Sequence, residues 1–514
     1  MSAKTTFSEI SPSEFFYRNR DLAGFSNPSR ALYSAVREIV ENSLDSCELY
    51  RILPEIYVRL SYVDGEEDKP EPKKYELLAV DNGSGIEKEQ IPKAFGRIFY
   101  GSKYRLRQTR GMFGMGGTMA VLYSQITTNR AVEITSSVDG KTAYKFVMLI
   151  DIEKNYPSIL SEEDNDAKGW RGTKVKLQLV GDYFRSSSKI NDYFKNTALV
   201  TPYANITFVD PNGKMMQFLR NTNTMPEPPK ETLPHPHGID VEAVKRLIKN
   251  WKGGTMTKFM VQTFHRVGNK IALDFLSYAG IPSNIDPREL SNEDIVKLTD
   301  ALHAYDKFLP PDGRCLSPLG EEIFTAGIVK ELEPEFYAVE VREPAAYSGY
   351  PFIIEVGLAY GGKNNQPGLR LLRFANRIPL LYDEGSDVSF KVLNEEIDFK
   401  RYNVPQDAPL SIITHISSTK VPYKTVGKEY IADRPEIEKE LRNGMREVLR
   451  KLQVYLGRKG SMEKQRRKMN IYSRYMPLIA RFSAALVGAK KLPPYNKLIG
   501  LDMFQDDDNA DKVG

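Results

Sequence analysis

The sequence predicts an α/β protein with several domains, and three observations support this class. Strand-like and helical stretches alternate over about the first 230 residues. Glycine-rich loops lie at the ends of these stretches, where the backbone can turn sharply and approach a ligand. The 514 residues are 41% apolar and 27% charged, which is ordinary for a globular protein and provides material for several cores.

The composition also excludes several classes of protein. No run approaches the ~18–20 apolar residues that a membrane span needs, and the N-terminus lacks the apolar core of a secretory signal. Only two cysteines are present, Cys47 and Cys315, without a CxxC pair, so neither a disulfide framework nor a cysteine zinc site is expected. We therefore expect a cytoplasmic protein that does not span a membrane.

Proline-containing breaks near residues 224–238 and 309–313 divide the chain. Apolar spacing from Ile437 onward predicts a long amphipathic helix after the second break. We expect four regions: an α/β region (1–230), a mainly helical region (231–310), a region with β-rich stretches (311–470), and a basic segment with an acidic, disordered tail (471–514).

The net charge of +5 is unevenly distributed. Residues 441–491 hold 14 Lys and Arg against two acidic residues, a net of +12, so the rest of the chain sums to −7. A basic segment on a mildly acidic body indicates a polyanion or an acidic partner, and a solvated helix face is the alternative.

One predicted helix carries polar side chains suited to metal-assisted hydrolysis. Residues 31–46 repeat apolar residues at i, i+3 and i+4, so one face should pack on a core. Glu38, Asn42 and Asp45 follow one another at i, i+4 and i+7 and share a different face. An acid one turn from an amide oxygen suits a general base beside hydrated Mg²⁺, although acids also occur on plain solvent faces of helices.

Two glycine loops follow this helix. An apolar strand, 77–80, leads into Asp81, whose carboxylate can accept a hydrogen bond from an exocyclic amine such as that of adenine, and Gly83 and Gly85 allow close approach. A plain Asn-Gly turn is the alternative. The second loop, 110–118, leads into a helix-like stretch, and its amide groups can form an anion cradle. It is not a P-loop, because no Gly-Lys-Ser/Thr follows.

The order of the motifs is more specific than any single one. E-x-x-x-N, D-x-G-x-G, G-x-x-G-x-G-G-T and a later Gly-Thr occur in one chain. Together they resemble the GHKL (Bergerat) ATP-binding fold shared by gyrase-type topoisomerases, MutL repair proteins, heat-shock-ninety chaperones and histidine kinases. Within this superfamily the chain is most similar, over nearly its whole length, to the B subunits of type IIB topoisomerases (topoisomerase VI). The segments that carry the resemblance are SPSEFFYRNRDLAGFSNPSRAL, REIVENSLDS, VDNGSGI, GSKYRLRQTRGMFGMGG, RFANRIPLLYDEG and STKVPYKTVGKEYIA.

The resemblance implies that the chain binds and hydrolyses ATP with Mg²⁺. Glu38 would be the general base, Asn42 would bind Mg²⁺, and Asp81 would contact the adenine amine. The other implied ATP contacts are Gly83, Gly85, Ser102, Lys103, Gly111, Met112, Phe113, Gly114, Met115, Gly116, Gly117, Thr118 and Thr173.

The resemblance also assigns the later regions. Residues 231–310 would form a helix–two-turn–helix domain, and residues 311–470 an α/β transducer domain with a long stalk helix. The transducer would donate a lysine to the γ-phosphate. This position maps best onto Lys420, and Lys424 and Lys428 are close enough to remain open.

The implied function is that of an ATP-gated clamp. Two copies would dimerise through an N-terminal strap, residues 1–25 or so, when ATP binds and couple turnover to double-strand DNA passage. The separate topoisomerase VI A chain, which carries the strand-cleaving tyrosine, would complete an A2B2 heterotetramer. The alternatives are a mismatch-repair clamp and a DNA-binding scaffold with an inactive nucleotide fold. A histidine kinase is excluded, because no histidine precedes His235.

Two further features are assigned no site. His235 and His237 are interpreted as part of a loop, since no third metal ligand is in view. Asp164 and Asp166 resemble a metal-binding acidic pair, but they are expected in an acidic loop, SEEDNDAKG, and not at a strand end.

Overall fold

The computed structural model describes residues 9–101, 105–111, 114–362, 367–424, 428–493 and 495. The chain forms two compact units. One comprises the residues up to Ile397 together with Gln406–Val448, and the other comprises Asp398–Pro405 and the residues from Leu449 onward. Within the described ranges, no helix combines the length and apolar character required to cross a bilayer.

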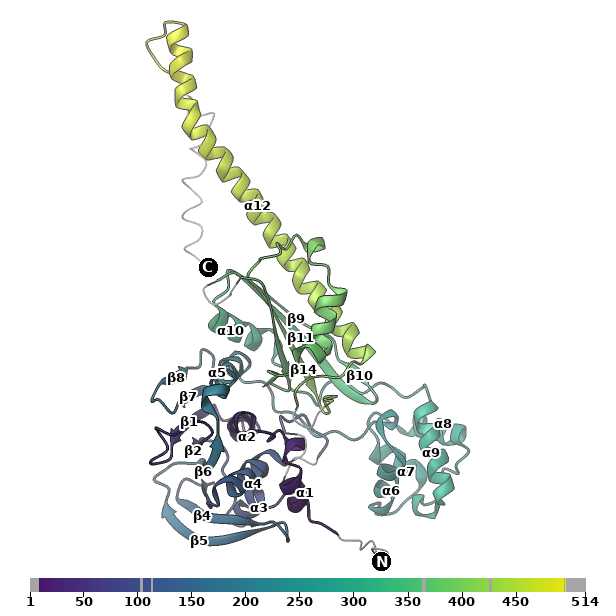
Figure 1. Ribbon diagram of the computed structural model, residues 1–514. Coiled ribbons are helices and arrows are strands. Elements are labelled where there is room, and N and C mark those ends of the chain that lie inside the picture. The colour runs from purple at the N-terminus through teal and green to yellow at the C-terminus, as the bar shows by residue number, and fades with distance from the viewer. Residues whose placement is uncertain are drawn as a thin grey trace, which may run out of the picture. The chain divides into compact units, whose positions relative to one another are not determined.

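The first unit begins with a layered α/β domain built on an eight-stranded sheet (Figure 1). The strand order is β5-β4-β3-β6-β2-β1-β7-β8, and neighbouring strands are antiparallel except for β1 and β7. The strands are β1 (Glu55–Tyr62), β2 (Lys73–Val80), β3 (Val132–Ser137), β4 (Thr142–Asp151), β5 (Tyr156–Asp166), β6 (Gly172–Gly181), β7 (Asn205–Val209) and β8 (Met215–Phe218). The helices are α1 (Pro12–Arg18), α2 (Pro28–Glu48), α3 (Ile91–Gly96), α4 (Gly116–Thr128) and α5 (Tyr183–Val200).

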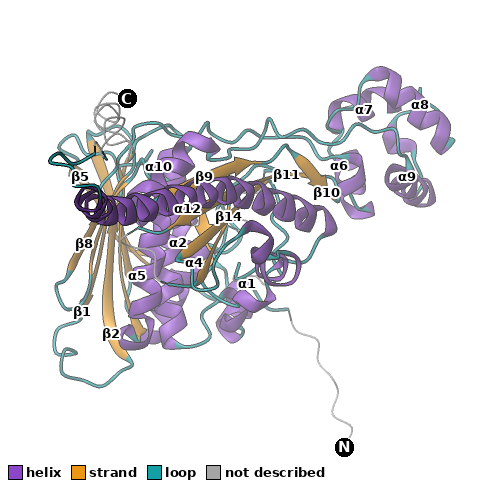
Figure 2. Ribbon diagram, turned by 90° about the horizontal axis from the view of Figure 1, so that it is seen from above, coloured by secondary structure: helices purple, strands orange, loops and turns teal. Residues whose placement is uncertain are grey.

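Helix α2 forms the centre of the helical layer beside this sheet (Figure 2). It begins at Pro28, and the side chain of Asn27 caps it by accepting a hydrogen bond from the N–H of Arg30 at 2.9 Å. The apolar face predicted from the sequence is confirmed. Its residues are buried: Leu32, Ala35, Val36, Ile39 and Val40. Because this face packs in the core, the opposite polar face is held in a fixed position.

The prediction that Asp164 and Asp166 lie in an acidic loop is wrong. Residues 161–166 belong to β5, which is the edge strand of the sheet and pairs along its length with β4. The Nζ of Lys88 lies 2.8 Å from Glu162 and 3.0 Å from Asp164. Pairing with β4 overrides the low strand propensity of Asp and Asn, and charged side chains on an edge strand discourage pairing with another chain.

A helical segment of the first unit follows this sheet. Its helices are α6 (Val241–Lys249), α7 (Met256–Thr263), α8 (Asn269–Ala279) and α9 (Asn292–Ala304), and they enclose an apolar core of their own. Helix α8 ends at Gly280, which adopts a left-handed backbone. Helix α9 begins after Ser291, which forms a capping box with Asp294.

Histidines fix the junction where the chain enters and leaves this helical domain. His235 Nε2 lies 2.9 Å from the carbonyl of Leu309, and His237 Nε2 lies 2.9 Å from the carbonyl of Tyr305. Because the N–H of His237 donates to Nδ1 of His235, the proton of His235 is on Nε2, which donates to Leu309. The interpretation of both histidines as part of a loop is corrected for His237, which lies in the single 3-10 turn Pro236–Gly238, and His235 caps this turn. The contacts of the two histidines join the two chain segments of the junction.

We expect acid to weaken this junction through His235. Burial lowers the pKa of His235 from 6.5 to about 4. The unfolded chain therefore takes up a proton before the folded chain does, and the stability that this histidine contributes is lost as the pH falls from 6.5 to about 4. His235→Gln keeps an N–H donor without this titration, so its unfolding free energy should fall less between about pH 7 and pH 4.5 in urea titrations. Equal losses in both proteins would contradict this expectation.

The remaining part of the first unit is a second α/β domain on a six-stranded sheet. The strand order is β10-β11-β14-β12-β13, with β9 paired to β11, and β12 and β14 are parallel. The strands are β9 (Phe336–Val341), β10 (Ala345–Tyr347), β11 (Tyr350–Tyr360), β12 (Leu369–Ala375), β13 (Ile378–Pro379) and β14 (Leu410–Ser418). The helices are α10 (Gly320–Leu332), α11 (Val388–Lys391) and the long α12 (Pro435–Leu486), which continues from the first unit into the second.

Candidate active site

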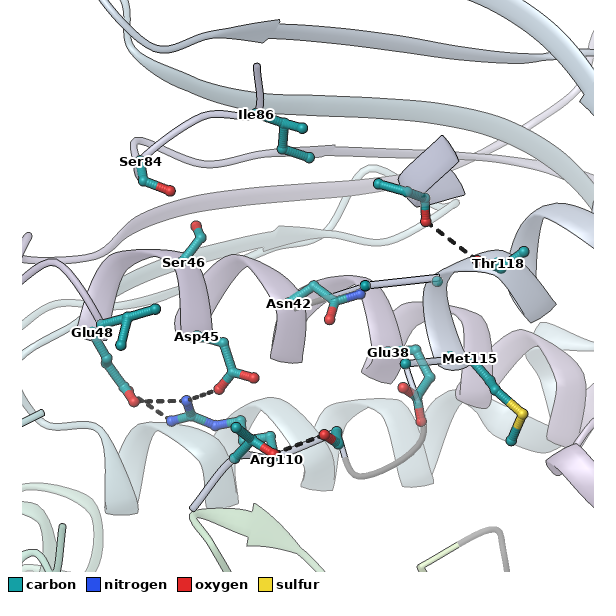
Figure 3. Close-up of a pocket in the computed structure, with 18 of the residues that line it drawn as sticks. Glu38, Asn42, Asp45, Ser46, Glu48, Ser84, Ile86, Arg110, Met115 and Thr118 are labelled. Atoms are coloured by element: carbon teal, nitrogen blue, oxygen red, sulfur yellow. Dashed lines mark hydrogen bonds and ion pairs between the residues drawn. The ribbon is translucent and has the colours of Figure 1, made fainter. Parts of the chain in front are cut away.

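A cavity of about 700 Å³ lies between α2, the glycine loop before α4, and residues of the second α/β domain (Figure 3). This volume is within the range of roughly 300–1,000 Å³ that ligand pockets occupy. The sequence-predicted residues that line it are Glu38, Asn42, Gly85, Gly111, Gly114, Met115, Gly116, Gly117 and Thr118. The sequence-predicted residues that lie outside the described part of the chain are Ser102, Lys103, Met112 and Phe113.

Helix α2 presents Glu38 and Asn42 to the cavity on successive turns, facing the start of α4 (Figure 3). A side chain at Gly116 could not be accommodated, because its Cβ would lie 1.6 Å from Oε2 of Glu38. The N-terminal amides of α4 therefore approach the carboxylate closely, and their partial positive charge favours an anion in the same space. A carboxylate beside an anion cradle is an arrangement that can support hydrolysis of a phosphoanhydride.

Asp81, Gly83 and Thr173 come together next to the cavity but do not line it. Oδ1 of Asp81 accepts hydrogen bonds from the N–H groups of Gly83 at 2.9 Å and Thr173 at 3.1 Å, and Oδ2 accepts one from the Ser43 hydroxyl at 2.8 Å. Burial raises the pKa of Asp81, although these three donors oppose that shift. The next glycine, Gly85, has a φ of +71° and lines the cavity.

The structure does not bring Lys420 to the cavity. This lysine lies two positions after the end of β14. Its Nζ lies 3.3 Å from the hydroxyl of Tyr350 on β11 and 4.7 Å from the centre of that ring. Lys428 lines the cavity instead. Its Nζ lies 3.4 Å from Oε1 of Glu38 and 3.1 Å from Oε2 of Glu41. Of the three lysines left open by the sequence, Lys428 is therefore the one beside the candidate base.

Lys428 belongs to a buried cluster of opposite charges. Arg37 Nη2 lies 2.8 Å from Glu38, and Arg37 Nε lies 3.5 Å from Glu41, so two cations accompany two carboxylates. Burial disfavours the Lys428 ammonium, but Glu38 and Glu41 outweigh this effect, and the pKa of Lys428 rises above its ordinary value. The two carboxylates therefore favour the ammonium form of Lys428 beside Glu38.

Sequence reasoning missed a second group of cavity residues: Glu48, Arg110, Asn376 and Arg377. Arg110 forms a two-pronged pair with Glu48 at 2.7 and 2.6 Å, and its Nη1 also lies 2.9 Å from Asp45 (Figure 3). Burial raises the pKa of Glu48, but Arg110 and Arg377 outweigh it, so the net shift is downward. Arg110 directly precedes the first glycine of the second loop, yet no spacing rule pairs it with Glu48.

The fold and the cavity define an ATPase of the GHKL class. A family model described as histidine kinase-, DNA gyrase B- and HSP90-like ATPase matches residues 30–170, and a model of the topoisomerase VI B subunit transducer matches residues 311–468. The chain is 44% identical to the type 2 DNA topoisomerase 6 B subunit of Metallosphaera sedula, over 98% of this chain and 96% of that protein. It is 43% identical to the protein of the same name from Sulfurisphaera tokodaii, over 94% and 91% of the two chains. The chain therefore belongs to the family of type 2 DNA topoisomerase 6 B subunits.

This membership confirms the resemblance seen in the sequence and excludes the alternative that the chain is a mismatch-repair clamp. Among solved structures, the N-terminal domain of a DNA repair protein gives a TM-score of 0.42 at 12% identity, covering 86% of this chain and 99% of that one. The Aquifex aeolicus MutL ATPase domain complexed with ADP gives a TM-score of 0.31 at 10% identity, covering 75% of this chain and 90% of that one. Both similarities are too low to support a functional comparison.

Proposed function

We propose that the chain is the ATP-hydrolysing clamp subunit of a type IIB topoisomerase. Nucleotide binding would close a dimer of this chain, and turnover would drive double-strand DNA passage by a separate DNA-cleaving subunit. The observation that supports this function best is the convergence of three groups on one cavity. They are a carboxylate on α2, a glycine loop at the start of α4, and a lysine from the second α/β domain.

ATP would lie with its adenine near Asp81, Gly83 and Thr173 and with its phosphates along the loop 111–118. The amides of this loop and the N-terminus of α4 suit the negative phosphates. An ionised Asp81 would accept a hydrogen bond from the adenine amine. The proposed contacts that lie beyond the described residues are Ser102, Lys103, Met112 and Phe113.

Asn42 fits a Mg²⁺ ion, which binds few protein oxygens and keeps phosphates and waters as its other ligands. A Cβ on Gly117 would lie 3.1 Å from Nδ2 of Asn42, so a side chain at this position would crowd the amide. Bound Mg²⁺ would neutralise charge on the phosphates. Glu38, one turn away on α2, would orient the attacking water and accept its proton.

Lys428, and not Lys420, is the transducer lysine that we propose to contact the γ-phosphate. Its Nζ is already 3.4 Å from Glu38. A γ-phosphate in the anion cradle would compete with Glu38 for this ammonium, which is a compact point charge on a flexible stem. If the ammonium group of Lys428 moved from Glu38 to the γ-phosphate, Glu38 would also become available as a base.

Dimerisation is proposed to use the N-terminal strap, because apolar side chains are exposed there and the strap reaches the cavity. The exposed apolar residues of the strap and of the adjoining loop are Ile10, Phe15, Tyr17, Leu22 and Phe99. The rings of Phe16 and Phe99 lie 6.0 Å apart, which connects strap and loop. Ala23, at the end of the strap, lines the cavity. A second copy of the chain would cover this apolar surface when nucleotide is bound.

The second unit is proposed to bind the DNA-cleaving A chain of topoisomerase VI in an A2B2 heterotetramer that also contacts double-stranded DNA. The last turns of α12 expose apolar side chains that a partner could cover: Ile471, Tyr472, Tyr475, Leu478, Ile479, Phe482 and Leu486. Exposed Lys and Arg residues at 464–468 could contact either acidic groups of the partner or DNA phosphates. Cys47 and Cys315 are both buried thiols, which fits a reducing cytoplasm.

We expect the purified chain to change from monomer to dimer on addition of a non-hydrolysable ATP analogue with Mg²⁺, as measured by analytical ultracentrifugation. Asn42→Ala should prevent this shift, because it removes the proposed Mg²⁺ ligand. Asn292→Ala is a matched control on the surface of the helical domain and should dimerise as the wild type does. Dimerisation of Asn42→Ala at the wild-type analogue concentration would contradict the assignment of Asn42, and a wild-type chain that stays monomeric with bound analogue would contradict the clamp.

A further inference from the structure

A strained turn of the second α/β domain enters the cavity. Asn376 and Arg377 connect β12 to β13 with φ angles of +47° and +64°. Side-chain-bearing residues rarely adopt this left-handed backbone, and they keep it where the surroundings determine it. Both side chains line the cavity. The transducer domain therefore reaches the cavity at two places, through this turn and through Lys428.

On the cavity side, this turn is bonded to the segment that precedes the glycine loop. Asn376 Nδ2 donates to the carbonyl of Thr109 at 3.0 Å. Arg377 Nη2 lies 3.5 Å from Oε2 of Glu48, and the same carboxylate forms the two-pronged pair with Arg110. Arg377 is thus linked through Glu48 to the residue next to Gly111.

On the transducer side, the turn is bonded to a fully buried polar chain. The N–H of Arg377 donates to Nε2 of His415 on β14 at 3.0 Å, which places the histidine proton on Nδ1. Nδ1 donates to Glu355 on β11 at 2.6 Å. Glu355 in turn accepts the N–H groups of Leu319 and Gly320 at the start of α10, at 3.0 and 2.7 Å.

We propose that Arg377 is a positioning residue that couples the glycine loop to the transducer domain. This inference rests on the proposed ATP-gated clamp. Movement of the loop on nucleotide binding would shift Arg110 and Glu48, and Glu48 would carry Arg377 and the strained turn with it. From the turn, the bonds to His415 and Glu355 lead to α10.

One further observation fits a residue that changes partners. Arg377 is 5% exposed, yet its Nε and Nη1 have no hydrogen-bond partner among the residues that the structure describes. Buried donors of this kind are rare in folded proteins and call for an explanation. The same guanidinium makes its two contacts, to Glu48 and to Ser317 Oγ at 3.2 Å, through Nη2 alone. When the loop moves, Nε or Nη1 of Arg377 could take over the contact that Nη2 makes with Glu48, so that the pair stays bonded.

The test compares Arg377→Gln with Arg373→Gln in the full-length chain. Arg373 is the matched control, because it is a similarly buried arginine on the adjoining strand β12 but pairs with Asp387 at 3.2 Å and does not line the cavity. The analogue concentration for half-maximal dimerisation should rise about tenfold for Arg377→Gln, which is an ordinary size for coupling between sites. It should stay at the wild-type value for Arg373→Gln. Binding of a fluorescent ATP analogue and the thermal unfolding midpoint are measured on the same samples.

A double-mutant cycle tests whether Arg377 acts through Glu48. If it does, the double variant Arg377→Gln, Glu48→Gln should need no higher analogue concentration for half-maximal dimerisation than the more impaired of the two single variants. If the two residues act independently, the fold-increases of the two single variants should multiply. Arg377→Lys keeps the charge and should recover part of the loss, which keeps the test open if the glutamine variant folds poorly. Equal dimerisation of the Arg377 and Arg373 variants, or multiplying effects in the cycle, would overturn the proposal. A wild-type chain that binds the analogue without dimerising would remove the clamp and this inference together.

Discussion

Replacing Glu38 with glutamine is expected to lower the rate of ATP hydrolysis by about 10²–10⁴-fold, the usual contribution of a positioned general base. Glutamine keeps the shape of the side chain and the contact with the start of α4, but it cannot accept the proton of the attacking water. Nucleotide should still bind, since the glycine loop and Asn42 are unchanged. Phosphate release at saturating ATP and calorimetric binding of a non-hydrolysable analogue separate the two effects.

Glu41 offers a matched control for this substitution. It is 2% exposed, lies on the same helix, and pairs with Lys428 at 3.1 Å, but it does not line the cavity. Glu41→Gln should therefore keep its turnover within about tenfold of the wild type. A deeper loss in Glu41→Gln than in Glu38→Gln would show that the wrong carboxylate has been assigned as the base.

The second large effect is expected at Lys428. Lys428→Ala should lower turnover at saturating ATP by about 10²–10³-fold, as removal of one preorganised charge from a reacting anion does. Lys420→Ala should stay within about twofold, because Lys420 contacts Tyr350 and not the cavity. The measurement is steady-state phosphate release by the two variants side by side. A larger loss of turnover in Lys420→Ala than in Lys428→Ala would instead support Lys420, the position inferred from the sequence.

Stability must be measured together with this rate. Lys428→Ala removes one of the cations of a buried cluster, and breaking such a pair costs about 3–5 kcal/mol. Lys428→Arg keeps the positive charge beside Glu38 and Glu41 and should restore the unfolding midpoint. Its planar, delocalised group differs from the compact ammonium, so we expect turnover to recover only in part. Recovery of stability without full turnover would separate the structural from the catalytic contribution of Lys428.

Local signals in the sequence predicted much of this molecule. Apolar periodicity identified α2, and because the helix has 3.6 residues per turn, it also placed Glu38 and Asn42 on one cavity-facing side. The same reasoning failed for residues 161–166, where pairing with β4 outweighs the polar composition of the segment.

The parts of the site that come from the second α/β domain were less predictable. Lys420 and Lys428 are separated by eight positions in one lysine-containing segment, and only the path of the chain decides which of them reaches Glu38. Arg377 lies in one of the segments that carry the resemblance, but no local pattern singled it out, because its proposed role depends on Glu48, a residue more than 300 positions earlier. Contacts of this kind are a property of the tertiary structure and leave no local pattern in the sequence.

The distance along the chain between Glu38 and Lys428 has a consequence for synthesis on the ribosome. The two residues are 390 positions apart, yet they share one buried cluster. At about 5–20 residues per second, roughly 20–80 seconds pass between their translation. During that interval Arg37 is the only cation of this cluster that has been synthesised to accompany Glu38 and Glu41. If Lys428 has the role proposed for it, a half-made chain would lack one group of the hydrolytic site, and we expect nucleotide turnover only after the second α/β domain has been synthesised and folded.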